Sequence, residues 1–171
     1  WDEAINASRL AQLEQEIIRA QLLEFDILML SEAVTPNAIK GDSKTLSFFE
    51  SLVANQNRPI LTGNLAYYSE SNRWYNGIFL IEPKTGLNPI YYAKKRLVPF
   101  GEYTPKPFKG IMESFAGPQG AFYPGTTDGI IPIHLKGKTY AFGTLICYED
   151  TFPEFARETV RAGADIIYVA T

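Results

Sequence analysis

The fold class of this chain is decided by residues 139–170, TYAFGTLICYEDTFPEFARETVRAGADIIYVA. Residues 139–146 are rich in apolar and β-branched types after a turn, which predicts a strand. Thr151 is expected to cap a helix that Gly163 ends. Residues 165–170 form a second apolar run, which predicts another strand. The stretch therefore predicts strand, helix and strand in succession.

The same succession extends back to the start of the chain. Apolar residues at helical spacing predict helices within residues 2–24 and 43–55. Strands are expected at 27–30, near 60–68, 74–82 and 89–94, and as a hairpin of 129–135 with 139–146. Because helices alternate with strands and hairpins, we expect one α/β domain over residues 1–171 with a mixed sheet.

The composition is that of an ordinary folded domain. The chain has 171 residues, of which 46% are hydrophobic and 20% charged, so a disordered or collagen-like chain is excluded. The net charge of -3 disfavours binding to nucleic acid, which needs an excess of positive charge. A single cysteine cannot form an internal disulfide. We see no metal-ligand cluster and no phosphate-binding glycine loop, so we expect neither a metal nor a cofactor.

The two ends and the apolar runs bear on how much of a protein this chain is. No apolar run reaches the roughly 20 residues that a membrane-spanning helix needs. The chain starts at Trp1, and its last predicted strand stops at Thr171 with no turn after it. We therefore expect it to be a segment of a longer protein.

Cys147 is the candidate nucleophile, because it lies where a strand ends and a helix is about to begin. A helix N-terminus favours the thiolate, the form that attacks a carbonyl carbon. The single histidine, His134, lies in the hairpin, and at about 3.3 Å per strand residue it is more than roughly 20 Å from Cys147. This distance disfavours a Cys–His dyad. The alternative interpretation of Cys147 is a buried, unreactive thiol.

A carboxylate and a lysine are the remaining candidates for the chemistry. Glu32 directly follows an apolar run that predicts a buried strand, a partly desolvated place that suits a general base, although it could also cap the next loop. Lys94 and Lys95 end another strand, where one of them could stabilise an oxyanion. Their side chains alternate, so only one can point into a given site. The residues themselves do not choose between the two lysines, and a solvated basic strand end is the alternative.

The Pro- and Gly-rich stretch 104–128 follows neither the helical nor the strand period, so we expect a long excursion. It carries apolar side chains that would be unusual on an exposed loop. We interpret these as candidates for contact with lipid or a partner, although burial against another domain explains them equally well. The candidates are Phe108, Ile111, Met112 and Phe115, with Phe122 and Tyr123 further along.

Glu32, Lys94 and Cys147 occur in that order, each at the end of a predicted strand. This pattern resembles the nitrilase superfamily of carbon–nitrogen hydrolases. Residues 94–103, KKRLVPFGEY, resemble within it the signature of the bacterial apolipoprotein N-acyltransferase family. The similarity continues at further short motifs, namely Thr62-Gly63, Tyr75-Asn76, Pro124-Gly125 and Cys147-Tyr148-Glu149.

The resemblance implies a role for each of these residues. The catalytic lysine of the family stands three residues before a leucine, which here is Leu97, so the match is Lys94. Glu32 then matches the general base and Cys147 the nucleophile. Where the family has Trp-Pro before the glutamate, this chain has Leu30-Ser31.

Further residues match supporting positions of the family. Glu102 and Glu149 match acidic residues that hold the lysine and the surroundings of the nucleophile. The backbone N–H of Tyr148 would help Lys94 to bind the oxyanion, as the geometry of acyl transfer also suggests.

The resemblance also implies a fold and an activity. The fold is an αββα sandwich, with a first strand before Trp1 and further strands after Thr171. The activity is transfer of an acyl chain from a phospholipid, through a thioester on Cys147, to the amine of a diacylglyceryl-cysteine lipoprotein. The catalytic domain would face the periplasm at the bacterial inner membrane, held there by parts outside this chain. Two alternatives are a nitrilase-type amidase that hydrolyses a small C–N bond and an inactive relative that serves as a binding module.

Overall fold

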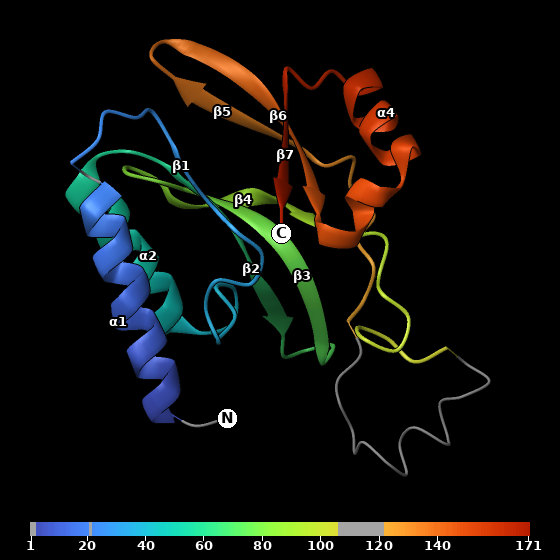
Figure 1. Ribbon diagram of the computed structural model, residues 1–171, viewed down its shortest axis with the longest axis horizontal. Coiled ribbons are helices and arrows are strands. Elements are labelled where there is room, and N and C mark those ends of the chain that lie inside the picture. The colour runs from blue at the N-terminus through green and yellow to red at the C-terminus, as the bar shows by residue number, and fades with distance from the viewer. Residues whose placement is uncertain (1–2, 21, 106–121) are drawn as a thin grey trace.

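The computed structural model describes residues 3–20, 22–105 and 122–171, with the side chains of the first helix from residue 7 onward (Figure 1). The first half of the chain comprises α1 (Glu3–Ala20), β1 (Leu28–Leu30), α2 (Ser43–Gln56), β2 (Ile60–Tyr68), β3 (Arg73–Glu82) and β4 (Gly86–Ala93). The second half comprises β5 (Ile130–Leu135), β6 (Lys138–Ile146), the 3-10 helix η2 (Cys147–Thr151), α4 (Pro153–Arg161) and β7 (Ile166–Ala170). These elements confirm the α/β class and the expected order of helices and strands.

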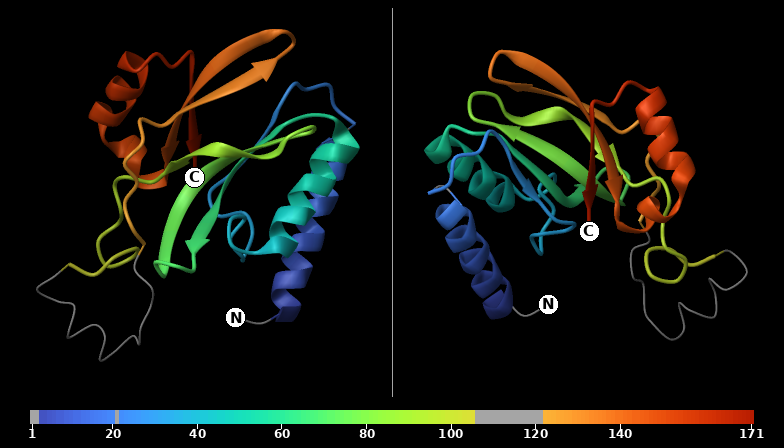
Figure 2. Two further views of the ribbon diagram at one scale, coloured as in Figure 1. Left: turned by 180° about the vertical axis from the view of Figure 1, so that it is seen from behind. Right: turned by 45° about the horizontal axis from the view of Figure 1, so that its top comes forward.

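The strands form two mixed sheets that pack face to face between helices. The first sheet has the order β1-β2-β3-β4 and the second the order β5-β6-β7. In each sheet one pair of strands is parallel, β1 with β2 and β6 with β7, and the other pairs are antiparallel. Helices α1 and α2 cover the outer face of the first sheet, and α4 covers the second (Figures 1 and 2). The architecture is the expected αββα sandwich.

Alternation along the central strands divides the core into two layers. On β3, Phe79 and Ile81 face the helices, where they pack with Phe49 and Val53 of α2. Ile78 and Leu80, which alternate with them on β3, face the second sheet. The same layer also contains Tyr92 of β4, Ile131 and Ile133 of β5, and Phe142 and Ile146 of β6. Because both faces of this part of β3 are covered, residues 78–81 form a continuous apolar run.

A tyrosine joins the two sheets at one edge. The Tyr168 hydroxyl of β7 donates a hydrogen bond to the backbone carbonyl of Leu30, the last residue of β1. Burial raises the pKa of Tyr168 to about 12, so the hydroxyl keeps its proton at neutral pH. The end of β1 is therefore tied to the middle of β7.

Two local predictions are wrong in detail. Thr151 does not cap α4: it ends η2, its hydroxyl donates to the carbonyl of Tyr148 at 2.8 Å, and the residue before α4 is Phe152. The strand before Glu32 is not buried, since Met29 is 47% exposed. The reason is that β1 is an edge strand, which an apolar run of this length does not reveal.

Part of the predicted excursion lies outside the described residues. This applies to Phe108, Ile111, Met112 and Phe115, so their expected contact with lipid stays a prediction. Among the described helices, none combines the length and the apolar character that crossing a membrane requires.

Helix α2 begins at a side-chain cap that gives a testable prediction. Asp42 accepts hydrogen bonds from the Thr45 amide at 2.9 Å and the Thr45 hydroxyl at 2.7 Å, and these lower the pKa of Asp42. The ionised cap therefore stabilises the fold above about pH 4 and loses that effect as the pH falls through its folded pKa. Asp42→Ala should lower the free energy of unfolding by about 0.5–2 kcal/mol at pH 7, and less at pH 3.

Urea unfolding at both pH values measures this difference, and Asp42→Asn is the matched control. Asparagine keeps the acceptor, so this variant should retain most of the stability at pH 7 without its dependence on acid. An Ala variant as stable as the original protein at pH 7 would contradict the capping role.

Candidate active site

Glu32 is placed by the close packing of β1 on β2. Gly63 of β2 lies so near the chain after β1 that a Cβ there would be 2.5 Å from the Ser31 carbonyl oxygen and 2.7 Å from the Glu32 Cα. The Gly63 carbonyl accepts a hydrogen bond from the Val34 amide. Ala33, which lies between Glu32 and Val34, adopts a left-handed φ of 46°. The backbone on both sides of Glu32 is thus fixed, and its side chain is 21% exposed.

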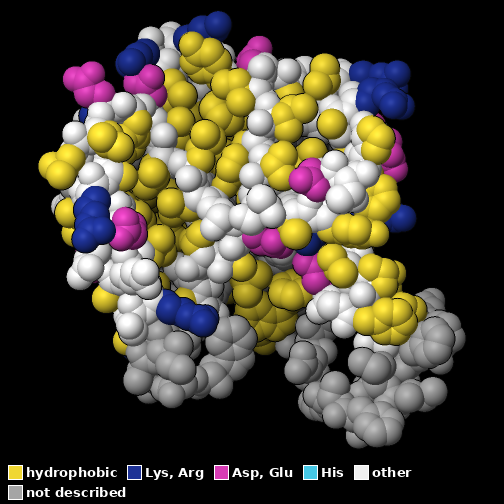
Figure 3. Space-filling model, viewed as in Figure 1, with side chains coloured by type: hydrophobic (Ala, Val, Ile, Leu, Met, Phe, Trp, Pro, Cys, Tyr) yellow, Lys and Arg dark blue, Asp and Glu magenta, His cyan; other side chains and the backbone are white. Residues whose placement is uncertain are grey.

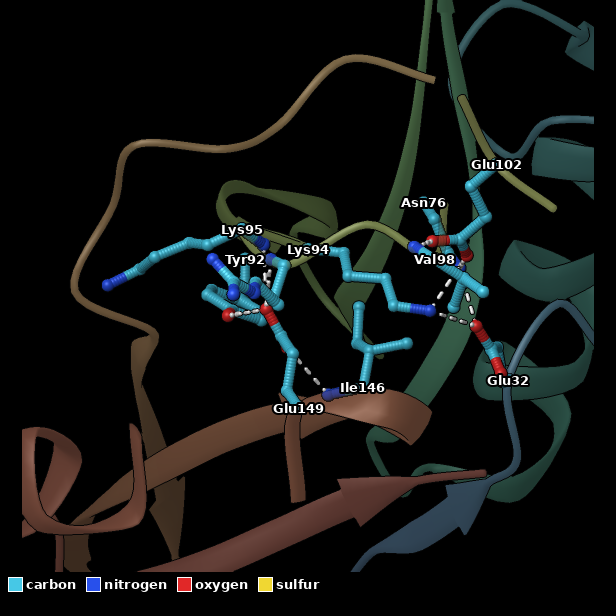
Figure 4. A network of polar contacts seen from close by, with 10 residues as sticks. Glu32, Asn76, Tyr92, Lys94, Lys95, Val98, Glu102, Ile146 and Glu149 are labelled. Carbon is cyan, nitrogen blue, oxygen red and sulfur yellow. Dashed lines mark hydrogen bonds and ion pairs between the residues drawn. The ribbon is translucent and has the colours of Figure 1, made fainter. Parts of the chain in front are cut away.

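Lys94 directly follows β4 and is 1% exposed. Its backbone N–H donates to the Asn76 carbonyl at 2.8 Å, and its carbonyl accepts from Gly125 at 2.9 Å. Its Nζ lies 3.2 Å from Oε1 of Glu32 and 2.7 Å from Oε1 of Glu102 (Figure 4). Burial alone would lower the pKa of Lys94, but the two carboxylates outweigh it and raise the pKa above its ordinary value. The lysine is therefore a buried cation.

Glu102 is held by the turn that precedes it. Its Oε2 accepts a hydrogen bond from the Val98 amide at 2.8 Å, and its own amide donates to the Val98 carbonyl at 2.9 Å. Its carbonyl accepts from Phe122 at 2.9 Å, which ties the turn to the far side of the excursion. One oxygen of Glu102 is thus used by the turn and the other by Lys94.

Asn76 of β3 completes this group, although the sequence predicts no role for it beyond its place in the Tyr75-Asn76 motif. Its Nδ2 donates to Oε1 of Glu32 at 2.6 Å and contacts Oε1 of Glu102 at 3.4 Å (Figure 4). The side chain is 4% exposed. A polar residue inside an otherwise apolar strand was the available signal, because a buried amide needs partners.

Glu149 forms a second, separate network. Its carboxylate is fully buried and accepts four hydrogen bonds, from the Tyr92 hydroxyl at 2.7 Å and from the amides of Lys95, Arg96 and Ile146 at 2.7, 3.0 and 2.9 Å. Burial, followed by the nearby carboxylate, raises the pKa of Tyr92, so this hydroxyl stays a donor. Glu149 therefore joins the end of β4 to the end of β6.

Cys147 directly follows Ile146, the last residue of β6, and so lies next to the Glu149 network. It is half-buried, opens η2 and has a left-handed φ of 45°. Helix α4 begins only at Pro153, so the structured turn after Cys147 is the short η2 rather than the expected α-helix. Within the described residues no hydrogen bond joins its thiol to Glu32 or Lys94. The structure thus brings Glu32, Lys94 and Glu102 into contact. Glu149 bonds the amide of Ile146, next to Cys147, and the amide of Lys95, next to Lys94.

Within the described residues, no hydrogen bond or ion pair joins the side chains of Lys95, Tyr148 or His134 to the Lys94 ammonium. Figure 4 shows the Lys95 side chain running away from Glu32, although its backbone N–H binds Glu149. Tyr148 is 36% exposed and its ring packs edge-on against Phe152 at 5.0 Å. His134 is exposed and contacts the Thr139 hydroxyl at 3.3 Å, as expected for a hairpin residue. Among the described residues no three His, Cys, Asp or Glu side chains gather as a metal site.

Two mixed sheets between helices, with a buried lysine held by two carboxylates, are the arrangement that the nitrilase superfamily predicts. The chain belongs to the carbon-nitrogen hydrolase family, whose profile matches residues 2–171. Solved structures agree on the fold. They include an amidase from Nesterenkonia sp. (TM-score 0.67, 17% identity, 97% of this chain and 59% of that one) and a carbon-nitrogen hydrolase from Helicobacter pylori (0.62, 17%, 97% and 54%).

Relatives that are closer in sequence carry a different name. The chain is 30% identical over 162 residues to the apolipoprotein N-acyltransferase of Pseudomonas syringae pv. tomato, covering 91% of this chain and 30% of the relative. The enzyme of the same name from Haemophilus influenzae is 30% identical over 176 residues, covering 98% and 32%. The chain therefore spans less than a third of the length of these two curated relatives.

The four hydrogen bonds to Glu149 give a prediction about stability. Glu149→Gln replaces one acceptor oxygen by an NH2 group, which would then face backbone N–H donors. Leaving buried donors without an acceptor costs about 1–3 kcal/mol each, so the free energy of unfolding should fall by at least that amount. Glu158→Gln, an exposed change of the same chemistry, should stay within about 0.5 kcal/mol. Denaturant unfolding of both variants provides the measurement, and equal values would contradict the role of Glu149.

Proposed function

We propose that this chain is the catalytic domain of an acyltransferase that acts through a thioester on Cys147. The buried contact of Lys94 with Glu32 and Glu102 carries the proposal, because it supplies a base and a cation at one place. The acyl donor is a phospholipid and the acceptor is the amine of a diacylglyceryl-cysteine lipoprotein. The similarity to relatives named apolipoprotein N-acyltransferase over 91% and 98% of the chain supports this choice.

The first step forms the acyl-enzyme. Glu32 takes the thiol proton of Cys147, and the sulfur attacks the carbonyl carbon of the phospholipid ester. Lys94 and the backbone N–H of Tyr148 stabilise the oxyanion. The ester C–O bond then breaks, and the leaving oxygen takes the proton from Glu32. The products are a lysophospholipid and a thioester.

The second step transfers the acyl chain to nitrogen. The α-amine of the acceptor attacks the thioester carbon, and Glu32 removes a proton from the nitrogen. The C–S bond breaks, and the sulfur of Cys147 leaves as a thiolate that takes the proton back. In this scheme Glu102 holds Lys94, and Glu149 holds the turn that presents Cys147.

A lipid substrate fits the apolar surface around these segments. Figure 3 shows hydrophobic side chains gathered directly below acidic ones near the centre of this face. Phe100, Tyr103 and Tyr123 are 56%, 38% and 40% exposed and belong to segments that adjoin Glu102. We place the domain on the periplasmic side of the bacterial inner membrane, with the longer protein supplying the attachment.

The thioester is directly testable by intact-protein mass spectrometry. The whole protein, in detergent with phosphatidylethanolamine and no acceptor, should gain the mass of one acyl chain. Hydroxylamine should remove that mass, because it cleaves thioesters, and Cys147→Ala should abolish the gain. If the protein stays unmodified and steadily releases ammonia from simple amides, the amidase alternative replaces this proposal. If it shows neither signal, a non-catalytic binding module replaces it.

The apolar excursion gives a second test. Phe108→Ser with Phe115→Ser should slow thioester formation at least tenfold, since each lost aromatic contact with lipid weakens binding by about 1.5–3 kcal/mol. The measurement is the rate of acyl-enzyme formation against donor concentration, with the exposed Val160→Ser on α4 as control. Turnover unchanged by the double substitution would remove the excursion from lipid contact.

A further inference from the structure

Asn76 stands between the two carboxylates that hold Lys94. Its Nδ2 is 2.6 Å from Oε1 of Glu32 and 3.4 Å from Oε1 of Glu102. The amide has to point this way, because its carbonyl oxygen would be repelled by both acids. Its Oδ1 is then buried, and no hydrogen bond reaches it from the described residues.

The contacts of Glu32 are divided unequally between its two oxygens. Oε1 accepts from both Asn76 and Lys94, at 2.6 and 3.2 Å. Within the described part of the chain, no donor is bonded to Oε2. A carboxylate fixed through one oxygen keeps the other available for a proton.

The unpartnered Oδ1 shows that folding alone does not account for Asn76. A buried acceptor without a partner is unfavourable, so a side chain chosen for stability would satisfy both of its ends. Asn64, on the neighbouring strand β2, is such a side chain. Its Nδ2 donates to the Thr35 hydroxyl at 2.7 Å, and its Oδ1 accepts from the Leu65 amide at 2.7 Å.

We propose that Asn76 is a positioning residue that holds Oε1 of Glu32 so that Oε2 receives the proton of the nucleophile. The inference rests on the proposed function, in which Glu32 is the base. The Asn76 amide also has a second role, because it places a neutral donor between Glu32 and Glu102, the two carboxylates that share Lys94. Without this donor, Glu32 is free to rotate about its side-chain bonds and to present either oxygen to Lys94.

The test compares Asn76→Asp, Asn76→Ala and the control Asn64→Ala in the whole protein. Both substitutions of Asn76 should lower the rate of acyl-enzyme formation at saturating phosphatidylethanolamine by ~10–100-fold. Removal of a residue that hydrogen-bonds a ligand in a metal enzyme has an effect of this size. The donor concentration for half-maximal rate should stay unchanged. Asp should be slower than Ala, because it sets a third carboxylate against Glu32. Asn64→Ala should lower the melting temperature and leave the rate of the folded protein near its original value.

The order of the two variants separates positioning from packing. If Asn76 only filled space, the isosteric Asp variant would be the milder one. An Asp variant faster than Ala, or an Ala variant as fast as the original protein, would overturn the inference.

Alkylation of Cys147 by iodoacetamide tests the positioning role of Asn76 independently of the acyltransferase proposal, because the reaction needs no acyl donor. The Asn76 variants should alkylate more slowly than Asn64→Ala even if the original protein forms no thioester. In that case the acyltransferase proposal fails and the positioning role stands. Equal alkylation rates in all variants would contradict the positioning role.

Discussion

The site depends on one buried cation. The Lys94 ammonium is 1% exposed and lies between two carboxylates at 2.7 and 3.2 Å. Removing a charge from water is unfavourable unless its partners repay the cost, and breaking such a buried pair costs about 3–5 kcal/mol. The fold therefore has to bring Glu32 to Lys94, and each strand of the first sheet contributes to this.

The strand order explains how the two ends meet. Glu32 follows β1 and Lys94 follows β4, so β2 and β3 lie between them. On β2 the position is Gly63, which has no side chain to push β1 away. On β3 it is Asn76, whose amide spans the gap to Glu32. The small residue and the polar residue in two apolar strands are thus both explained by the same contact.

The two glutamates that support the site, Glu102 and Glu149, have different tasks. Glu102 gives one oxygen to Lys94 and the other to Val98, so it sets the charge around the lysine. Within the described residues Glu149 forms no ion pair, and its four donors are neutral, three of them backbone amides. Its ladder of hydrogen bonds fixes the end of β6, and hence Cys147, relative to the end of β4. One carboxylate therefore acts through charge and the other through geometry.

Features that repeat along one segment could be predicted from the sequence, whereas contacts between segments could not. The two layers of core alternate along β3, and Asp42 marks the start of α2, so the elements and their order were predictable. Patterns of one segment do not show contacts between segments. The edge position of β1 and the bridge of Asn76 to Glu32 depend on strand order, which no local period encodes. Thr151 was misplaced because η2 inserts a turn before α4.

Backbone strain at the site is also a feature that the residue types do not reveal. Six non-glycine residues in the described part have a left-handed φ, and Asn57, Asn72 and Lys136 among them occupy ordinary helix-end or turn positions. The others are Ala33, Phe100 and Cys147, which lie at or next to Glu32, the Glu102 turn and the nucleophile. Each costs about 1–3 kcal/mol and persists only where its surroundings fix it. Here hydrogen bonds hold the flanking backbone: the Val34 amide donates to the Gly63 carbonyl, the Glu102 amide to the Val98 carbonyl and the Ile146 amide to the Glu149 carboxylate. Because alanine, phenylalanine and cysteine have no preference for this conformation, the strain reports the demands of the site rather than of the local sequence.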